Sequence, residues 1–346
     1  MRMPSWGGQA PPPSTCEPPS ARPDTLRRTR LLLHAEMKFT TRDTAIHRVI
    51  ANAGKIILGK ERQIRLAVAC LLARGHLLIE DLPGVGKTTL AHTLAKLLGL
   101  AFQRISFTSD LLPADIIGVS VFDRDSGSFK FHPGPIFSQL ILADEVNRAT
   151  PKTQSALLEA MEEHQVTAEG ETRPLPEPFF VIATQNPSHQ VGTFPLPESQ
   201  LDRFLMRIEL GYPDRDAERA LLQGAERRIL VATLESCLAP GELLQSQASA
   251  DKVYAAPALL DYVQAIVEHT RHAPEFTNGL SPRAALGILH AAKAWAMLEG
   301  RDKVLPEDVQ AILPGVAGHR LAPAHEGARK RSSEVTAALI EAVPIP

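Results

Sequence analysis

The sequence has few of the features that would place it among disulfide-stabilised or membrane proteins. Its 346 residues include only three cysteines, Cys16, Cys70 and Cys237. They are too few and too far apart for a disulfide framework or a zinc site, so we expect a reducing compartment, the cytoplasm. No apolar run approaches the roughly 20 residues that a membrane-spanning helix needs, and membrane insertion is not expected.

An excess of charge of one sign is also missing. The chain has 37 Lys and Arg residues against 39 Asp and Glu residues, a formal net charge of −2. This balance predicts no general attraction to nucleic acid or to anionic membranes. What the sequence does have is a hydrophobic content of 44%, enough for a sizeable core divided between two domains.

Proline and small polar residues are concentrated in the first 36 residues. Such a composition cannot bury enough apolar surface to offset the entropy lost on ordering, so residues 1–36 are expected to form a disordered leader. A targeting segment is the alternative. Helical periodicity begins at Met37, which is also compatible with a start site there.

The apolar pattern changes at residues 211–213, Gly-Tyr-Pro, which end the last strand-like segment. Before this point, short apolar runs alternate with helical periodicity, which is typical of an α/β fold. After it, the pattern is helical throughout. We therefore predict an α/β core over residues 37–211 and an all-α domain over residues 212–346. A β-hairpin is expected over residues 119–131, an unusual insertion for a plain doubly wound sheet.

The stretch 76–90 gives the strongest functional signal. An apolar run predicts a buried strand, and it leads through residues 83–88 (PGVGKT) into a helical pattern. In a P-loop the glycines let main-chain N–H groups surround a phosphate, Lys87 reaches the β- and γ-phosphates, and Thr88 ligates Mg²⁺. Asp81 stands where the full motif has glycine, so an ordinary strand-turn-helix corner is the alternative. The expected nucleotide-binding residues are Gly84, Val85, Gly86, Lys87, Thr88 and Thr89.

Two further strand ends carry polar residues suited to phosphoryl transfer. The apolar run 140–143 ends in Asp144 and Glu145; Asp144 is expected to join Thr88 in holding Mg²⁺, and Glu145 to polarise the attacking water. A solvated carboxylate pair is the alternative. Asn186 follows another buried strand, where its amide could orient the water or could simply cap a turn.

Helix signals in the C-terminal half raise one further candidate. Ser281 as N-cap and Pro282 at the first position predict a helix that ends near Gly300. Arg283 then lies in a first turn, where the helix dipole disfavours positive charge; it is either functional or an ordinary surface residue. Another helix is expected to start at Pro306 and to stop at residues 314–315, Pro-Gly.

With these residues laid out, the sequence resembles the MoxR family of AAA+ ATPases. The resemblance implies a P-loop AAA+ core with a five-stranded parallel sheet, a hairpin inserted in the second helix and a C-terminal all-α lid. It covers the chain from about Met37 onward. The segments that carry it are GH (75–76), PGVGKT (83–88), FTSDLLP (107–113), GPIF (134–137), LADEVNRA (142–149), ATQNP (183–187), GTFPLPE (192–198), QLDRF (200–204), SPRA (281–284) and HR (319–320).

The resemblance also implies roles and partners. Asn186 is similar to the sensor that aligns water, Arg203 to an arginine finger that reaches the neighbouring subunit's nucleotide, and Arg283 to a lid sensor that touches the γ-phosphate of its own subunit. The family implies ATP and Mg²⁺ as cofactors, a ring that is usually hexameric, and remodelling of a client complex beside a von Willebrand factor A-domain partner. Val191 departs from the family pattern, in which an acidic residue is common there.

Two other functions share the P-loop. A DNA-dependent ring translocase has the same AAA+ core, although the charge balance and the lack of an appended DNA-binding module argue against it. A small-molecule kinase or a GTP switch is the third possibility. The sequence has no N-K-x-D motif for reading guanine, and comparing ATP with GTP turnover would separate these classes.

Overall fold

A computed structural model describes residues 45–186, 193–224, 226–322, 324 and 332–345. All of them belong to one compact unit. The predicted disordered leader (1–36) and the family departure at Val191 lie outside the described residues. None of the helices in the described ranges is long and apolar enough to cross a membrane.

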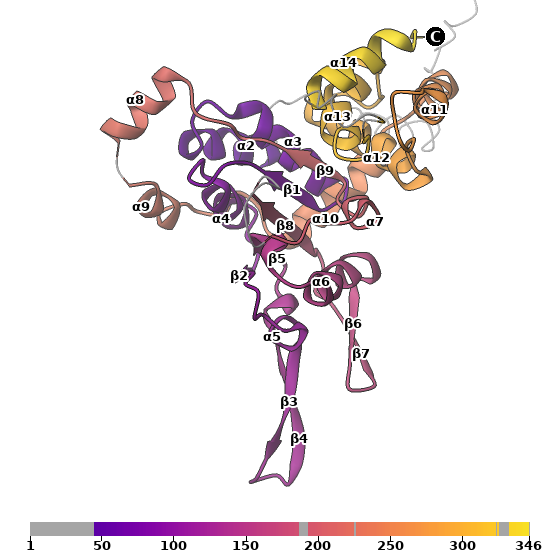
Figure 1. The fold of residues 1–346 in the computed structure, drawn as a ribbon. Helices are drawn as coiled ribbons and strands as arrows, with labels where there is room; N and C mark the ends of the chain where they lie inside the picture. The colour runs from indigo at the N-terminus through magenta and orange to yellow at the C-terminus, as the bar shows by residue number, and fades with distance from the viewer. Residues whose placement is uncertain (1–44, 187–192, 225, 323, 325–331, 346) are drawn as a thin grey trace, which may run out of the picture. The chain divides into compact units, whose positions relative to one another are not determined.

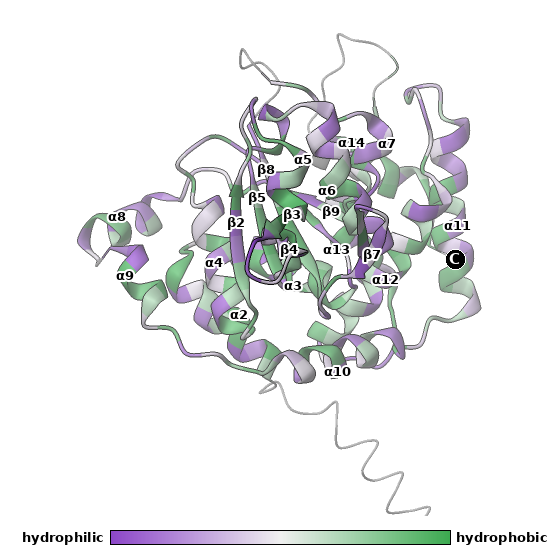
Figure 2. Cartoon of the chain, turned by 90° about the horizontal axis from the view of Figure 1, so that it is seen from below, coloured by the Kyte–Doolittle hydropathy of each residue, from purple (hydrophilic) through white to green (hydrophobic). Residues whose placement is uncertain are grey.

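The centre of the chain is a five-stranded sheet in which every neighbouring pair is parallel (Figure 1). This confirms the α/β fold class. In Figure 2 the central strands β5 and β8 are largely apolar, whereas the edge strand β2 is largely polar. In spatial order the strands are β2 (Phe102–Ser106), β5 (Leu140–Asp144), β8 (Phe180–Gln185), β1 (Leu77–Glu80) and β9 (Met206–Ile208).

The central strands are buried on both faces because helices cover both. Side chains alternate across a strand: Leu77 and Ile79 of β1 join one hydrophobic cluster, and Leu78 joins a second. β5 and β8 alternate between the same two clusters. The first cluster includes α2 (Ala45–Ile56), α3 (Glu61–Leu72) and α4 (Lys87–Leu97), and the second includes α5 (Pro113–Ile117) and α6 (Pro151–Glu163).

Two β-hairpins extend from the sheet. The predicted hairpin is confirmed as β3 (Gly118–Asp123) paired antiparallel with β4 (Ser128–Pro133). A second, which we did not predict, pairs β6 (Gln165–Ala168) with β7 (Glu171–Pro174). Figure 1 shows both on the same side of the sheet. They are joined where the Ser120 amide donates a 3.2 Å hydrogen bond to Glu169 Oε1.

Beyond residue 212 the described elements are helical, apart from an isolated bridge between Tyr254 and Lys303. Ser281 caps α12 by accepting a hydrogen bond from the Ala284 amide, as its sequence signal predicts. A short helix, α7 (Glu198–Leu201), precedes β9. The helices that follow are α8 (Arg215–Gln223), α9 (Arg227–Ala232), α10 (Pro240–Asp251), α11 (Pro257–His272), α12 (Pro282–Leu298), α13 (Pro306–Ala317) and α14 (Ser332–Ala342).

The prediction that a helix stops at Pro314 is wrong, because α13 continues through that proline to Ala317. Pro314 has no N–H to donate within the helix, a cost of about 3 kcal/mol. Val316 and Ala317, beyond the proline, are fully buried with Ile312 and Leu313. Burial of a valine side chain stabilises by about 1.5–3 kcal/mol and a buried methyl group adds about 0.8 kcal/mol, which together are comparable to the local cost.

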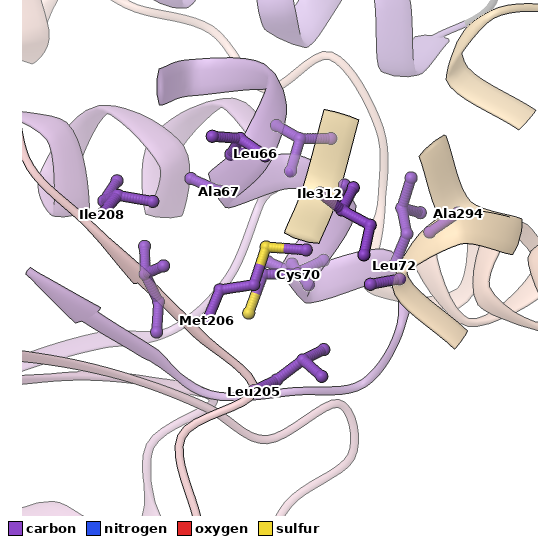
Figure 3. Packing of buried hydrophobic residues seen from close by; sticks show 14 of the residues in the cluster. Leu66, Ala67, Cys70, Leu72, Leu205, Met206, Ile208, Ala294 and Ile312 are labelled. Atoms are coloured by element: carbon purple, nitrogen blue, oxygen red, sulfur yellow. The ribbon is translucent and has the colours of Figure 1, made fainter. Parts of the chain in front are cut away.

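The C-terminal helices share a hydrophobic core with the sheet. Figure 3 shows Ala294 of α12 and Ile312 of α13 in the same cluster as Cys70, Leu205 and Met206 (Figure 3). This cluster crosses the expected boundary at residues 211 and 212. The division into domains at that point therefore stays a prediction.

A buried arginine fixes the contact between the C-terminal helices and the segment before β9. Arg320 donates through Nε to Asp202 Oδ1 at 2.7 Å and through Nη2 to the carbonyl oxygens of Asp202 and Phe204 at 2.9 and 2.8 Å. His319 Nε2 lies 3.0 Å from the same Phe204 oxygen. The His-Arg pair thus connects the C-terminal region to residues 202–204.

Candidate active site

Lys87 lies at the carboxyl edge of the sheet, where β1 leads into α4. Its side chain is only 8% exposed. The ammonium donates to the Asp81 carbonyl, to Asn186 Oδ1 at 3.1 Å and to the Gln185 carbonyl at 3.5 Å. Burial lowers the pKa of Lys87, and the nearby carboxylates, Asp81 first, oppose this shift. The charge is thus held among oxygens from the ends of β1 and β8.

The loop before Lys87 has the backbone conformation of a phosphate cradle. Gly84 and Gly86 have φ values of 86° and 98°, in the left-handed region that favours glycine. A Cβ at either position would meet no atom within 4 Å, so the space over the loop is open. Gly86 gives α4 no side-chain cap, which leaves the first N–H groups of the helix available to an anion.

The remaining loop residues differ in exposure. Val85 is half-buried and packs against the first hydrophobic cluster, Thr88 is exposed and Thr89 is half-buried. The Thr88 hydroxyl is therefore accessible at the first turn of the helix. This is the position from which the sequence predicts that it ligates a metal ion.

Asp144 and Glu145 are held side by side at the end of β5 by a residue that the sequence analysis did not select. Thr184 Oγ1 donates a 2.6 Å hydrogen bond to Asp144 Oδ1 and accepts one of 2.9 Å from the Glu145 amide. Glu145 has a left-handed backbone with φ of 57°, which is unfavourable for a residue other than glycine. Thr184 stabilises this turn through its bond to the Glu145 amide. The sequence gives no signal of this role, because a threonine in a strand-forming run is common.

Asn186 connects the lysine to the glutamate. It is 4% exposed; its Nδ2 donates to Glu145 Oε1 at 2.9 Å and its Oδ1 accepts from Lys87. The structure therefore brings Lys87, Asn186 and Glu145 into one continuous chain of hydrogen bonds. A neutral amide in this place can hold both the cation and the carboxylate.

Both carboxylates also pair with arginines. Arg104 of β2 contacts Asp144 Oδ2 through Nη2 at 2.5 Å, and Arg148 Nε lies 3.0 Å from Glu145 Oε2. Each arginine side chain is about half exposed. Exposed pairs of this kind are worth little in stability, so either arginine can move aside at a small cost when another cation approaches.

Arg203 is not brought to this cluster within the chain. Its Nη1 donates a 2.6 Å hydrogen bond to the Leu158 carbonyl of α6. Two residues later, the Leu205 amide bonds the His76 carbonyl at 2.9 Å, at the amino end of β1. Arg203 therefore lies toward the amino edge of the sheet, whereas Lys87 lies at the carboxyl edge.

Arg283 lies near Arg203 and also apart from Lys87. Its Nη2 is 2.5 Å from Glu162 Oε1 and its Nη1 is 3.8 Å from Asp202 Oδ2. Glu162 follows Met161, whose carbonyl lies 3.1 Å from His76 Nε2, again at the amino end of β1. The expectation that Arg283 touches the γ-phosphate in its own subunit stays a prediction, and this arrangement does not favour it.

The residues present fit a magnesium nucleotide. The uncapped helix start and open glycine loop suit a polyphosphate, and Lys87 adds the cation. Within the described ranges, no group of three or more His, Cys, Asp or Glu residues could hold a metal ion unaided. Mg²⁺ is usually bound by one or two protein ligands together with phosphates and water, and Thr88 and Asp144 suit that role.

Comparison with known proteins agrees with this geometry. The model of the ATPase family associated with various cellular activities matches residues 76–206, and the model of the AAA lid domain matches residues 268–339. A solved structure of a candidate ATPase from Cytophaga hutchinsonii superposes with a TM-score of 0.82 at 37% identity, covering 91% of this chain and 99% of that one.

Several relatives match this chain over most of their length. Chaperone MoxR1 of Mycobacterium tuberculosis is 41% identical over 80% of this chain and 75% of its own. Protein MoxR of Paracoccus denitrificans is 34% identical over 84% of this chain and 93% of its own. YeaC of Bacillus subtilis, an uncharacterised protein, is 44% identical over 79% and 86%. The chain is an ATPase, and it belongs to the MoxR family of AAA+ proteins.

Proposed function

We propose that Lys87, Asn186 and Glu145 form the hydrolytic centre. Lys87 neutralises phosphate charge, Asn186 orients a water molecule and Glu145 accepts its proton. Bound Mg²⁺, held by Thr88 and Asp144, would supply charge neutralisation at the phosphates. The observation that carries this proposal is the unbroken hydrogen-bond chain from Lys87 through Asn186 to Glu145.

The active assembly in this proposal is a ring of subunits, with six as the expected number. Arg203 and Arg283 both lie toward the amino edge of the sheet and form their contacts there with Leu158, Glu162 and Asp202. An arginine that does not reach the nucleotide bound by its own subunit can still contact the phosphates of the nucleotide bound by an adjacent subunit. We assign Arg203 the role of a finger acting across that interface, and we infer that Arg283 also acts across it, in place of the expected contact with the γ-phosphate of its own subunit.

The task of the ring is chaperone-like remodelling or maturation of a client complex, beside a von Willebrand factor A-domain partner. One relative is named a chaperone, which supports the general class. We propose a cytoplasmic location, which the small number of cysteines supports. The alternative, a DNA-dependent translocase, would be favoured if duplex or single-stranded DNA stimulated ATP hydrolysis by the purified protein.

Two substitutions test the hydrolytic centre. Lys87→Ala should weaken ATP binding by about ten- to a hundredfold, the loss expected for hydrogen bonds to a charged group. Glu145→Gln should bind ATP like the parent but turn it over about 10²–10⁴-fold more slowly, because it lacks the base. Glu163→Gln, which changes an exposed carboxylate at the end of α6, is the matched control. Parental turnover by Glu145→Gln would disprove the assignment of the base.

A further inference from the structure

Asp81 occupies the position at which the full P-loop motif has glycine. Its side chain accepts hydrogen bonds that a glycine, which has no side chain, could not form. Its carboxylate Oδ2 accepts hydrogen bonds of 2.6 Å from the amides of both Leu210 and Gly211. Its Oδ1 accepts from the Leu82 amide at 2.7 Å. The side chain therefore connects the start of the P-loop to the segment that leaves β9.

This connection begins where the sheet ends. The ladder between β1 and β9 stops at the pair formed by Ile79 and Ile208. Beyond this pair, the Asp81 carboxylate replaces the strand ladder by accepting hydrogen bonds from the Leu210 and Gly211 amides. Gly211 has a φ of 64°, and the chain turns there toward α8 and the C-terminal helices.

The main chain of Asp81 faces the nucleotide cradle. Its carbonyl oxygen accepts from the Lys87 ammonium, and its amide donates to the Gln185 carbonyl at 3.3 Å. When Lys87 binds phosphate oxygens, its hydrogen bonds to Asp81 and Asn186 have to be exchanged or shared. Asp81 thus accepts a hydrogen bond from Lys87 through its carbonyl oxygen. Through its carboxylate it also binds the backbone that leads from β9 to the C-terminal helices.

We propose that Asp81 is a positioning residue that couples occupancy of the P-loop to the segment 209–214. The inference rests on the proposed function, in which Lys87 binds the phosphates. Movement of the Lys87 ammonium shifts the Asp81 carbonyl, and the carboxylate of the same residue transmits that shift to the Leu210 and Gly211 amides. A glycine here would leave the cradle intact but disconnect it from this segment.

The segment has a second attachment, which makes the proposal testable without loss of the fold. Lys60, the residue before α3, donates from Nζ to the Tyr212 carbonyl at 2.7 Å. Without the Asp81 carboxylate, residues 209–214 stay attached through this bond and through β9. Asp81→Gly also restores the residue of the full P-loop motif, so nucleotide binding should survive.

Hydrogen exchange of the full-length protein with and without ADP and Mg²⁺ tests the coupling, with nucleotide affinity and ATP turnover measured in parallel. In the parent we expect nucleotide to change the exchange rates of the Leu210 and Gly211 amides. In Asp81→Gly these amides should exchange at least tenfold faster, as expected when bonds to a charged acceptor are lost, and should no longer respond to nucleotide. Affinity should stay within about threefold of the parent, while kcat falls about tenfold.

Two further variants separate coupling from simple loss of packing. Asp81→Glu retains a carboxylate and should recover part of the nucleotide response. Asp123→Asn changes a carboxylate that accepts a 3.0 Å bond from the Asp125 amide in the β3–β4 turn, and it should behave like the parent. A nucleotide response preserved in Asp81→Gly, or absent from a parent that binds and hydrolyses ATP, would overturn the inference and leave the hydrolytic function standing. A parent that fails to bind ATP would instead overturn the proposed function.

Discussion

The Thr184 hydroxyl donates a 2.6 Å hydrogen bond to Asp144 Oδ1, and its Oγ1 also accepts a 2.9 Å hydrogen bond from the Glu145 amide. One side chain of β8 therefore positions both carboxylate residues at the end of β5. A hydroxyl is required because it donates and accepts at once.

Thr184→Val should lower kcat by about ten- to a hundredfold while ATP affinity changes little. Valine has nearly the same shape but leaves the Glu145 amide unpaired, at a cost of about 1–3 kcal/mol, and it releases the strained turn at Glu145. Steady-state kinetics and denaturant unfolding measure the two effects. Thr184→Ser keeps the hydroxyl and should retain most of the activity; if serine and valine variants lose activity equally, packing rather than hydrogen bonding is responsible.

Arg203→Ala should bind ATP but lose hydrolysis by about 10³-fold or more, the range known for arginine fingers. The reason is that its guanidinium would act on the nucleotide of an adjacent subunit. Mixing Arg203→Ala with the Glu145→Gln protein should restore part of the turnover, because some interfaces then combine an intact glutamate with an intact arginine.

The mixing experiment has a clear opposite outcome. If Arg203 acted only inside its own chain, through its bond to the Leu158 carbonyl, no mixture with Glu145→Gln would regain activity. Thermal unfolding of Arg203→Ala alone shows whether the loss of that 2.6 Å bond destabilises the chain.

His76 should make the protein less stable in mild acid. Burial lowers the pKa of His76 from 6.5 to about 4, so between these values the unfolded chain binds more protons than the folded chain. The free energy of unfolding therefore falls as the pH falls, by about 2.5 kcal/mol between pH 7.5 and 4.5 for this group alone. Burial of His319, whose pKa is also lowered, acts in the same direction.

Denaturant unfolding across this pH range tests the contribution of His76. His76→Gln can still accept from the Val181 amide and donate to the Met161 carbonyl, as the imidazole does at 3.0 and 3.1 Å, but it does not titrate. Its stability should fall less steeply than that of the parent below pH 6.5. The exposed His290→Gln serves as control, and identical slopes for parent and His76→Gln would contradict the assignment.

Pro314→Ala should stabilise the protein by about 1–3 kcal/mol, because alanine restores the missing helical N–H and removes the steric conflict in α13. Pro306→Ala, at the first position of the same helix, should change stability little, since that N–H has no helical partner. Chemical denaturation of the two variants gives the comparison. A Pro314→Ala protein no more stable than the parent would show that Pro314 itself contributes to the packing of α13 and so offsets its local cost.

Much of this fold could be predicted because its signals are local. The glycines of the P-loop, the apolar strand runs and the Ser281 cap each depend on neighbouring residues, and the structure has all of them. The extension of α13 could not be predicted from such rules, because the burial of Val316 and Ala317, which offsets the cost of Pro314, depends on tertiary packing.

The site could be predicted in part for a similar reason. Lys87, Asp144, Glu145 and Asn186 stand at strand ends that a parallel sheet brings to one edge. Thr184 went unnoticed because threonine is common in strands, and its role depends on the register between β5 and β8. The positions of Arg203 and Arg283 depend on how α6, α7 and α12 pack, and no local pattern encodes that.

The adjacency of β5, β8 and β1 in the sheet has a consequence for protein engineering. Lys87, the carboxylate pair and Asn186 are each delivered by a different one of these three neighbouring strands. Deleting or inserting a single residue in any of them would shift one partner by about 3.3 Å and turn alternate side chains to the opposite face. Length changes should therefore be tolerated in the exposed β3–β4 turn, whereas the three central strands admit substitutions but no change in length.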